Sequence, residues 1–88
     1  MTDNRWRVLV SRPAASYLQS LSGEERERVR LRLKALEAGP FGQATRLQVR
    51  PQWSLRVGGL RVLLEVDVPT RTVRVVAAGP RGDIYKKP

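Results

Sequence analysis

Two arginines flank a pair of adjacent glycines in residues 53–68, which read WSLRVGGLRVLLEVDV. The residues on either side of Gly58 and Gly59 alternate between apolar and polar, which predicts a two-residue β-hairpin turn, because glycine adopts the required positive φ without strain. This turn would place Arg56 directly opposite Arg61 on one face of a sheet. Like charges in that position destabilise a sheet, so the pattern indicates a surface that concentrates positive charge. Guanidinium groups suit phosphate oxygens, and we expect the pair to bind phosphate; the simpler alternative is a solvated sheet face.

A second pair of candidate residues follows the last predicted strand. Arg81 and Tyr85 lie in the C-terminal segment RGDIYKKP. A tyrosine there could stack on an RNA base or handle a proton. The alternative is an aromatic residue packed on the edge of the domain.

The composition excludes several kinds of chemistry. The chain has 88 residues, which is enough for one domain spanning residues 1–88, and it has neither cysteine nor histidine. Disulfides, thiolate metal sites and the usual general base are therefore ruled out, and we expect no metal and no cofactor. No apolar run reaches the roughly 18 residues of a membrane span, and the N-terminus lacks a signal-peptide pattern. These features predict a cytoplasmic protein without a membrane partner.

The charge is strongly positive. The formal net charge is +9, fourteen of the 17 basic residues are arginine, and residues 41–88 carry nine basic against three acidic side chains. Such a balance favours a polyanionic partner, either nucleic acid or an acidic protein. The alternative is a charge that only keeps the protein in solution.

Two helices are predicted in the first half of the chain. Residues 6–10 read as a strand, after which Ser11 or Arg12 would cap a helix that begins at Pro13. Ser22 and Glu25 form an S-x-x-E capping box that starts a second helix, and this helix runs to about residue 38 before Gly39-Pro40. A break of about one residue separates the helices, so they should form an αα-hairpin. The mixed charges of the second helix fit a solvated face with i,i+4 pairs.

The second half of the chain is predicted to form most of the sheet. Residues 46–50 suggest a short edge segment, and strands are expected at 53–57, 60–68 and 71–78. The residues expected to face the core are Trp53, Leu55, Val57, Leu60, Val62, Leu64, Val66, Val68, Val73, Val75 and Ala77. Leu63 has the opposite phase. The predicted fold is α+β, in the order β-α-α-β-β-β, with the αα-hairpin packed on a mostly antiparallel four-stranded sheet.

The segment LRVGGLRVLLEV, followed by AGPRGDIY, resembles a known family pattern. It is similar to the R-V-G-x-[YL]-R-[VL]-L-x-E block of the RelE/ParE toxin superfamily, and the resemblance covers nearly the whole chain. RelE-type members are endoribonucleases that cut mRNA on the ribosome, whereas ParE-type members act on DNA gyrase. Both are neutralised by an antitoxin. The resemblance therefore implies an acidic cognate antitoxin as a partner, with mRNA on the ribosome, or alternatively DNA gyrase, as the target.

The resemblance also implies roles for individual residues. Arg56 occupies the position of a basic catalytic group, and Arg61 that of a phosphate-binding arginine. Arg81 would stabilise charge or protonate the leaving oxygen, and Tyr85 would orient the substrate. Ser54 departs from the RelE pattern, which has a lysine there. The residues expected to contact RNA are Arg50, which is the nearest substitute for that lysine, Ser54, Lys86 and Lys87.

Three functional hypotheses follow. The first is a metal-independent, ribosome-dependent mRNA endonuclease that uses the ribose 2′-OH as nucleophile. The second is a ParE-like gyrase inhibitor without nuclease activity, which the loss of the lysine at Ser54 favours. The third is a basic RNA-binding module without catalysis. The general base stays open in the first hypothesis, because arginine is almost always protonated; Tyr85, the RNA or the ribosome would have to supply it.

Overall fold

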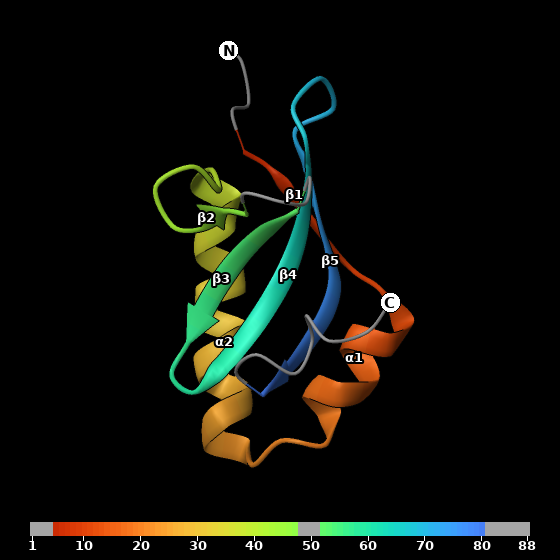
Figure 1. Ribbon diagram of the computed structural model, residues 1–88, viewed down its shortest axis with the longest axis vertical. Coiled ribbons are helices and arrows are strands. Elements are labelled where there is room, and N and C mark those ends of the chain that lie inside the picture. The colour runs from red at the N-terminus through yellow and green to blue at the C-terminus, as the bar shows by residue number, and fades with distance from the viewer. Residues whose placement is uncertain (1–4, 48–51, 81–88) are drawn as a thin grey trace.

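The helices and strands follow the predicted order (Figure 1). The computed structural model describes residues 5–47 and 52–80. Its elements are β1 (Arg7–Val10), α1 (Arg12–Gln19), α2 (Gly23–Ala35), the 3₁₀ helix η1 (Leu36–Ala38), β2 (Thr45–Arg46), β3 (Trp53–Val57), β4 (Leu60–Asp67) and β5 (Thr72–Pro80). The α+β class is therefore confirmed. No helix in the two described ranges is both long and apolar enough to cross a bilayer.

The sheet has five strands rather than the four predicted. Their order is β1-β5-β4-β3-β2; β1 runs parallel to β5 and the other neighbours are antiparallel. The additional strand, β2, begins at Thr45, one residue before the predicted edge segment, and already ends at Arg46. Residues 48–50 of that segment lie outside the described ranges. A two-residue strand is too short to produce the alternation that identifies strands in a sequence.

Serine side chains begin both helices. The Ser11 hydroxyl accepts a hydrogen bond from the Ala14 amide at 3.3 Å, and the Ser22 hydroxyl accepts one from the Glu25 amide at 3.2 Å. Each bond satisfies an amide that has no partner within its helix. Residues 20–22 join the helices, a longer connection than the predicted one-residue break. The Ser20 hydroxyl donates to the Tyr17 carbonyl at 2.6 Å, which competes with continuation of α1.

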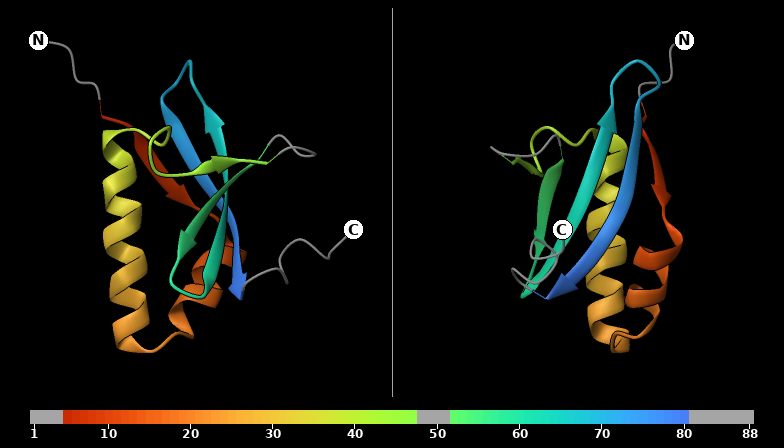
Figure 2. Two further views of the ribbon diagram at one scale, coloured as in Figure 1. Left: turned by 60° about the vertical axis from the view of Figure 1, so that its left-hand side comes forward. Right: turned by 45° about the vertical axis from the view of Figure 1, so that its right-hand side comes forward.

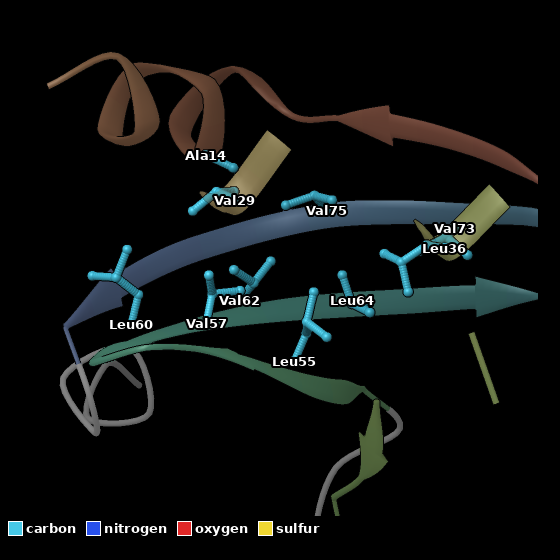
Figure 3. Close-up of a cluster of buried hydrophobic side chains, with 10 residues drawn as sticks. All are labelled: Ala14, Val29, Leu36, Leu55, Val57, Leu60, Val62, Leu64, Val73 and Val75. Carbon is cyan, nitrogen blue, oxygen red and sulfur yellow. The ribbon is translucent and has the colours of Figure 1, made fainter. Parts of the chain in front are cut away.

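The two helices cover the same face of the sheet, and the core lies between them and the strands (Figures 2 and 3). The buried cluster consists of Ala14, Val29, Leu36, Leu55, Val57, Leu60, Val62, Leu64, Val73 and Val75. The predicted inward phase of β3 and of the first part of β4 is therefore confirmed. Residues 5–47 and 52–80 place no helix on the opposite face, and we call it the helix-free face.

A β-bulge changes the phase of β5. Leu63 pairs with Ala77 and Leu64 pairs with Val75, which leaves Val76 as an extra residue. Beyond this point Ala78 packs against the core cluster, while Ala77 shares the phase of Leu63. The prediction that Ala77 faces the core was therefore wrong, because an inserted residue inverts the alternation of side chains.

Leu63 differs from the expectation of a lightly buried residue. It has the phase opposite to Leu64, as predicted, but only 5% of its surface is exposed. Burial on both faces of a sheet produces consecutive apolar residues, and residues 62–64 read Val-Leu-Leu. These consecutive apolar residues indicate burial on both faces, which alternation alone does not predict.

Aromatic residues close the core near β2. The Phe41 ring meets the rings of Trp6 and Trp53 edge-on, with centroid distances of 5.6 and 5.5 Å. Both tryptophans are half-buried and pack against the core cluster. The core assignment of Trp53 is confirmed.

Candidate phosphate-binding site

The β3–β4 hairpin has the predicted turn and register. Gly58 has a φ of 59°, and positive φ at the first central position is typical of the type II′ turn. Val57 pairs with Leu60 across the turn, and Arg56 pairs with Arg61. Residues directly opposite each other have Cβ atoms about 4.5–5.5 Å apart. The two arginine side chains therefore start from neighbouring positions on the helix-free face.

The surroundings of this pair are small or polar. Arg61 pairs on its other side with Gly79, so the row across the helix-free face reads Arg56, Arg61, Gly79. Arg56 is exposed and Arg61 is half-buried. Gly79 itself is buried, so the accessible part of this row consists of the two arginines. Ser54 lies in the next row of the same face, opposite Leu63.

Two arginines of α2 extend this positive cluster. The Arg32 guanidinium donates through Nη1 to the Arg56 carbonyl at 2.9 Å. Nη1 of Arg28 lies 3.8 Å from the position that a Cβ atom would occupy at Gly58. Arg28, Arg32, Arg56 and Arg61 thus surround one hairpin; we call them the hairpin arginines. Figure 1 shows the β3–β4 turn beside the first half of α2.

Sequence reasoning missed the two helical members of this cluster. The charges of α2 predict a solvated face with i,i+4 ion pairs. In the described ranges, the ion pair within 4 Å instead joins Glu27 to Arg30 at 2.6 Å, with i,i+3 spacing. The available signal was the i,i+4 spacing of Arg28 and Arg32, which places both on one side of a helix.

The electrostatics differ between Arg30 and the hairpin arginines. The hydrogen bond from Arg30 lowers the pKa of the Glu27 carboxyl, and Glu27 in turn raises the pKa of Arg30. Arg30 is thus neutralised locally. In residues 5–47 and 52–80, by contrast, no carboxylate lies within 4 Å of any hairpin arginine. The cluster therefore presents positive charge that an anion can neutralise.

The remaining predicted site residues cannot be placed. Arg50, Arg81, Tyr85, Lys86 and Lys87 lie outside the described ranges. Within those ranges, no three acidic side chains lie close enough together to hold a metal ion. The structure thus brings together Arg56, Arg61 and Ser54 of the predicted set and adds Arg28 and Arg32.

A separate groove lies between the two helices. Its volume is about 450 Å³, and it is lined by Leu18, Gly23, Arg26, Glu27, Val29, Arg30 and Leu33. None of the hairpin arginines borders it. The groove is therefore distinct from the candidate phosphate-binding site.

Comparison with solved structures identifies the fold. No protein-family model and no curated protein matches the chain. The RelE–RelB complex from Pyrococcus horikoshii OT3 is similar over 90% of this chain and 98% of that chain, with a TM-score of 0.79 and 22% identity. The complex RelBE2 from Mycobacterium tuberculosis gives a TM-score of 0.80 and 21% identity, over 88% and 99% of the two chains. The RelBE complex of E. coli gives 0.72 and 20%, over 85% and 95%. The chain has a RelE-like fold.

Proposed function

We propose that this protein is the toxin of a toxin–antitoxin system and a ribosome-dependent mRNA endoribonuclease that acts in the cytoplasm. The fold is that of RelE chains, several of which were solved in complexes with RelB. An acidic antitoxin that binds this chain fits its net charge of +9. The cationic surface would thus bind two anionic partners, RNA and the antitoxin.

The proposed reaction is an internal phosphoryl transfer in RNA. The ribose 2′-oxygen forms a bond to the adjacent phosphorus while the bond from phosphorus to the 5′-oxygen breaks. The 2′-OH proton leaves to a base, and the departing 5′-oxygen takes up a proton. The products are a 2′,3′-cyclic phosphate and a 5′-OH.

Arginine side chains support the step by charge stabilisation. Arg61 would bind the non-bridging phosphate oxygens, and Arg56 would stabilise the charge that develops on them in the transition state. Neither acts as a base, because the guanidinium stays protonated. Two further roles are carried over from the family resemblance alone: Arg81 would stabilise the charge on the leaving oxygen, and Tyr85 would orient the substrate.

One observation carries this proposal. Arg56 and Arg61 are opposed across two strands on the helix-free face, and neither has a carboxylate within 4 Å in the described ranges. A sheet is destabilised by such a pair, and a bound phosphate would remove the cost. The observation favours a phosphate ligand over a purely structural role.

A gyrase inhibitor is the second candidate. Ser54 stands on the same face as Arg56, at the position where the RelE pattern has a lysine. The loss of that cation weakens the case for RNA cleavage and favours a ParE-like activity. The two functions share the fold, so an activity assay must separate them.

The test is to compare the two activities of the wild-type protein directly. Primer extension on a reporter mRNA translated by purified ribosomes should reveal new 5′ ends, and DNA supercoiling by gyrase should be unaffected. Blocked supercoiling without cleavage would establish the gyrase inhibitor instead. Absence of both activities, together with RNA binding, would leave a binding module without catalysis.

A further inference from the structure

We infer that Arg28 and Arg32 extend the phosphate-binding site around the β3–β4 turn, so that the protein binds a second phosphodiester of RNA beside the one held by Arg56 and Arg61. This inference rests on the proposed function and specifies how its substrate is held. The second phosphate would lie at the edge of the sheet, between the turn and α2.

The positions of the two helical side chains support this site. Arg32 reaches from α2 to the backbone of Arg56 through a hydrogen bond of 2.9 Å, and Arg28 reaches the turn, 3.8 Å from the Cβ position of Gly58. Both contacts direct guanidinium groups towards a hairpin that already carries two arginines. Four like charges from three elements, α2, β3 and β4, thus gather around one turn, at an energetic cost that an anion would offset.

The helix offers Arg28 other partners, and it does not use them. Glu24 and Glu25 precede Arg28 by four and three residues, the spacings that favour ion pairs on a helix. Within the described ranges, neither carboxylate lies within 4 Å of Arg28, whereas Glu27 and Arg30 on the same helix do pair. The orientation of Arg28 towards the turn therefore leaves its charge available to a ligand.

The turn itself suits a nucleic-acid backbone better than a peptide. Gly58 and Gly59 are both exposed, and Arg28 and Arg56 beside them are exposed as well. A peptide interface needs apolar or aromatic anchors in its centre, and these four residues offer none. Binding to a nucleic-acid backbone depends mainly on charge, and a turn without side chains permits close approach.

The experiment measures how salt weakens RNA binding. The ligand is a short single-stranded RNA with 2′-O-methyl groups at every position, which cannot undergo 2′-OH attack, so binding is measured without cleavage. For single strands, the logarithm of the binding constant falls with the logarithm of salt concentration by about 0.7 for each phosphate contact. Because both arginines bind the same phosphate, the double variant Arg28→Gln/Arg32→Gln should lower this slope by about 0.7 relative to wild type.

A matched control lies on the same helix. Arg26→Gln/Arg30→Gln removes the same charge at the same i,i+4 spacing, from side chains that border the interhelical groove instead of the turn. We expect this variant to keep the wild-type slope. Arg28→Lys/Arg32→Lys should also keep it, since the charges remain, and circular dichroism should show that all three variants are folded. Equal losses in the Gln variant and its control would overturn the inference, and so would no loss in either variant with both the oligonucleotide and vacant ribosomes.

A second arm identifies which RNA supplies the phosphate. Affinity for vacant ribosomes is measured for the same variants. A loss with the oligonucleotide assigns the second phosphate to the mRNA strand, and a loss with vacant ribosomes alone assigns it to ribosomal RNA. A loss confined to binding of an acidic antitoxin would overturn the inference. Failure of the proposed function has a different signature, namely a normal salt slope in wild type without mRNA cleavage.

Discussion

The arginine side chains of the candidate site supply positive charge but do not transfer protons. The described part of the candidate site consists of Arg28, Arg32, Arg56 and Arg61 beside Ser54. Guanidinium groups bind phosphate and stabilise developing negative charge, but they do not exchange protons near neutral pH. A nuclease built in this way depends mainly on preorganised positive charge.

Replacing one arginine of the opposed pair tests this dependence. Arg61→Ala should reduce cleavage of ribosome-bound mRNA by about 100- to 1000-fold, as the loss of one preorganised donor does in other enzymes. Single-turnover primer extension gives the rate. Arg61 is a half-buried residue outside the core cluster, so the fold should be retained.

Arg74→Ala is the matched control for this substitution. Arg74 is an exposed arginine on β5, where it lies opposite Glu65 of β4, away from the β3–β4 turn. We expect its cleavage rate to stay near that of wild type. Similar losses at Arg61 and Arg74 would show that only the total charge of the sheet matters and would contradict the assigned role of Arg61.

At the scale of elements, Ser11 joins α1 to the bulge of β5. Its hydroxyl accepts a hydrogen bond from the Ala14 amide and donates one to the carbonyl of Val76 at 3.1 Å. Val76 is the extra residue of the bulge, whose backbone lacks a regular ladder partner. One side chain thus caps a helix and satisfies an irregular strand.

This double role predicts a larger effect of Ser11→Ala than of Ser22→Ala. The Ser22 change removes a helix cap and should lower the free energy of unfolding by about 1 kcal/mol. The Ser11 change also leaves the partly buried Val76 carbonyl without its donor, which adds about 1–3 kcal/mol. Urea unfolding measures both. Ser16→Ala, at an exposed position within α1, should have almost no effect, and equal losses at Ser11 and Ser22 would contradict the bulge contact.

The central strand provides a second prediction at this scale. Leu64→Ala should lower the free energy of unfolding by about 2–5 kcal/mol, because Leu64 is fully buried in the core cluster. Leu63 is also buried, so Leu63→Ala should approach the lower end of this range, in contrast to the small cost expected from strand phase alone. Leu31→Ala makes the same chemical change at a position on α2 that is 53% exposed and should stay within about 0.5 kcal/mol of wild type. If the Leu63 variant is as stable as the Leu31 variant, the burial of Leu63 does not contribute to stability and strand phase alone predicts the cost.

The sequence predicted the local features of the fold and missed those that depend on distant contacts. Ser22 and Glu25 predict the start of α2, and Gly58-Gly59 predicts the register of the hairpin. Both signals lie within a few residues of the feature that they predict. The bulge at Val76 depends on Ser11, which lies 65 residues away. The orientation of Arg28 and Arg32 likewise depends on β3 and its turn, so the opposed pair of the site was predictable and its helical extension was not.

At the scale of the whole molecule, the net charge should govern association. An acidic antitoxin would meet a chain with a charge of +9, and complementary potentials speed association. We expect the association rate to fall steeply as ionic strength rises, while the dissociation rate changes little. The family resemblance implies that the antitoxin is encoded beside the toxin, so stopped-flow mixing with the product of the neighbouring gene measures both rates. No complex at low salt would contradict the assignment of that product as the antitoxin.

Arg32 has a further consequence, which concerns aggregation. β2 pairs with Trp53 and Ser54, and no other strand of the described ranges pairs with this side of β3 beyond Ser54. Unpaired sheet edges recruit strands from other copies. The guanidinium of Arg32 occupies the Arg56 carbonyl there, and the surrounding cations repel a second copy that carries the same charges. We therefore expect the hairpin arginines also to reduce association between copies of the protein. Light scattering should confirm that variants of Arg32 are not aggregated before RNA binding is measured, since aggregation would also lower the apparent RNA affinity.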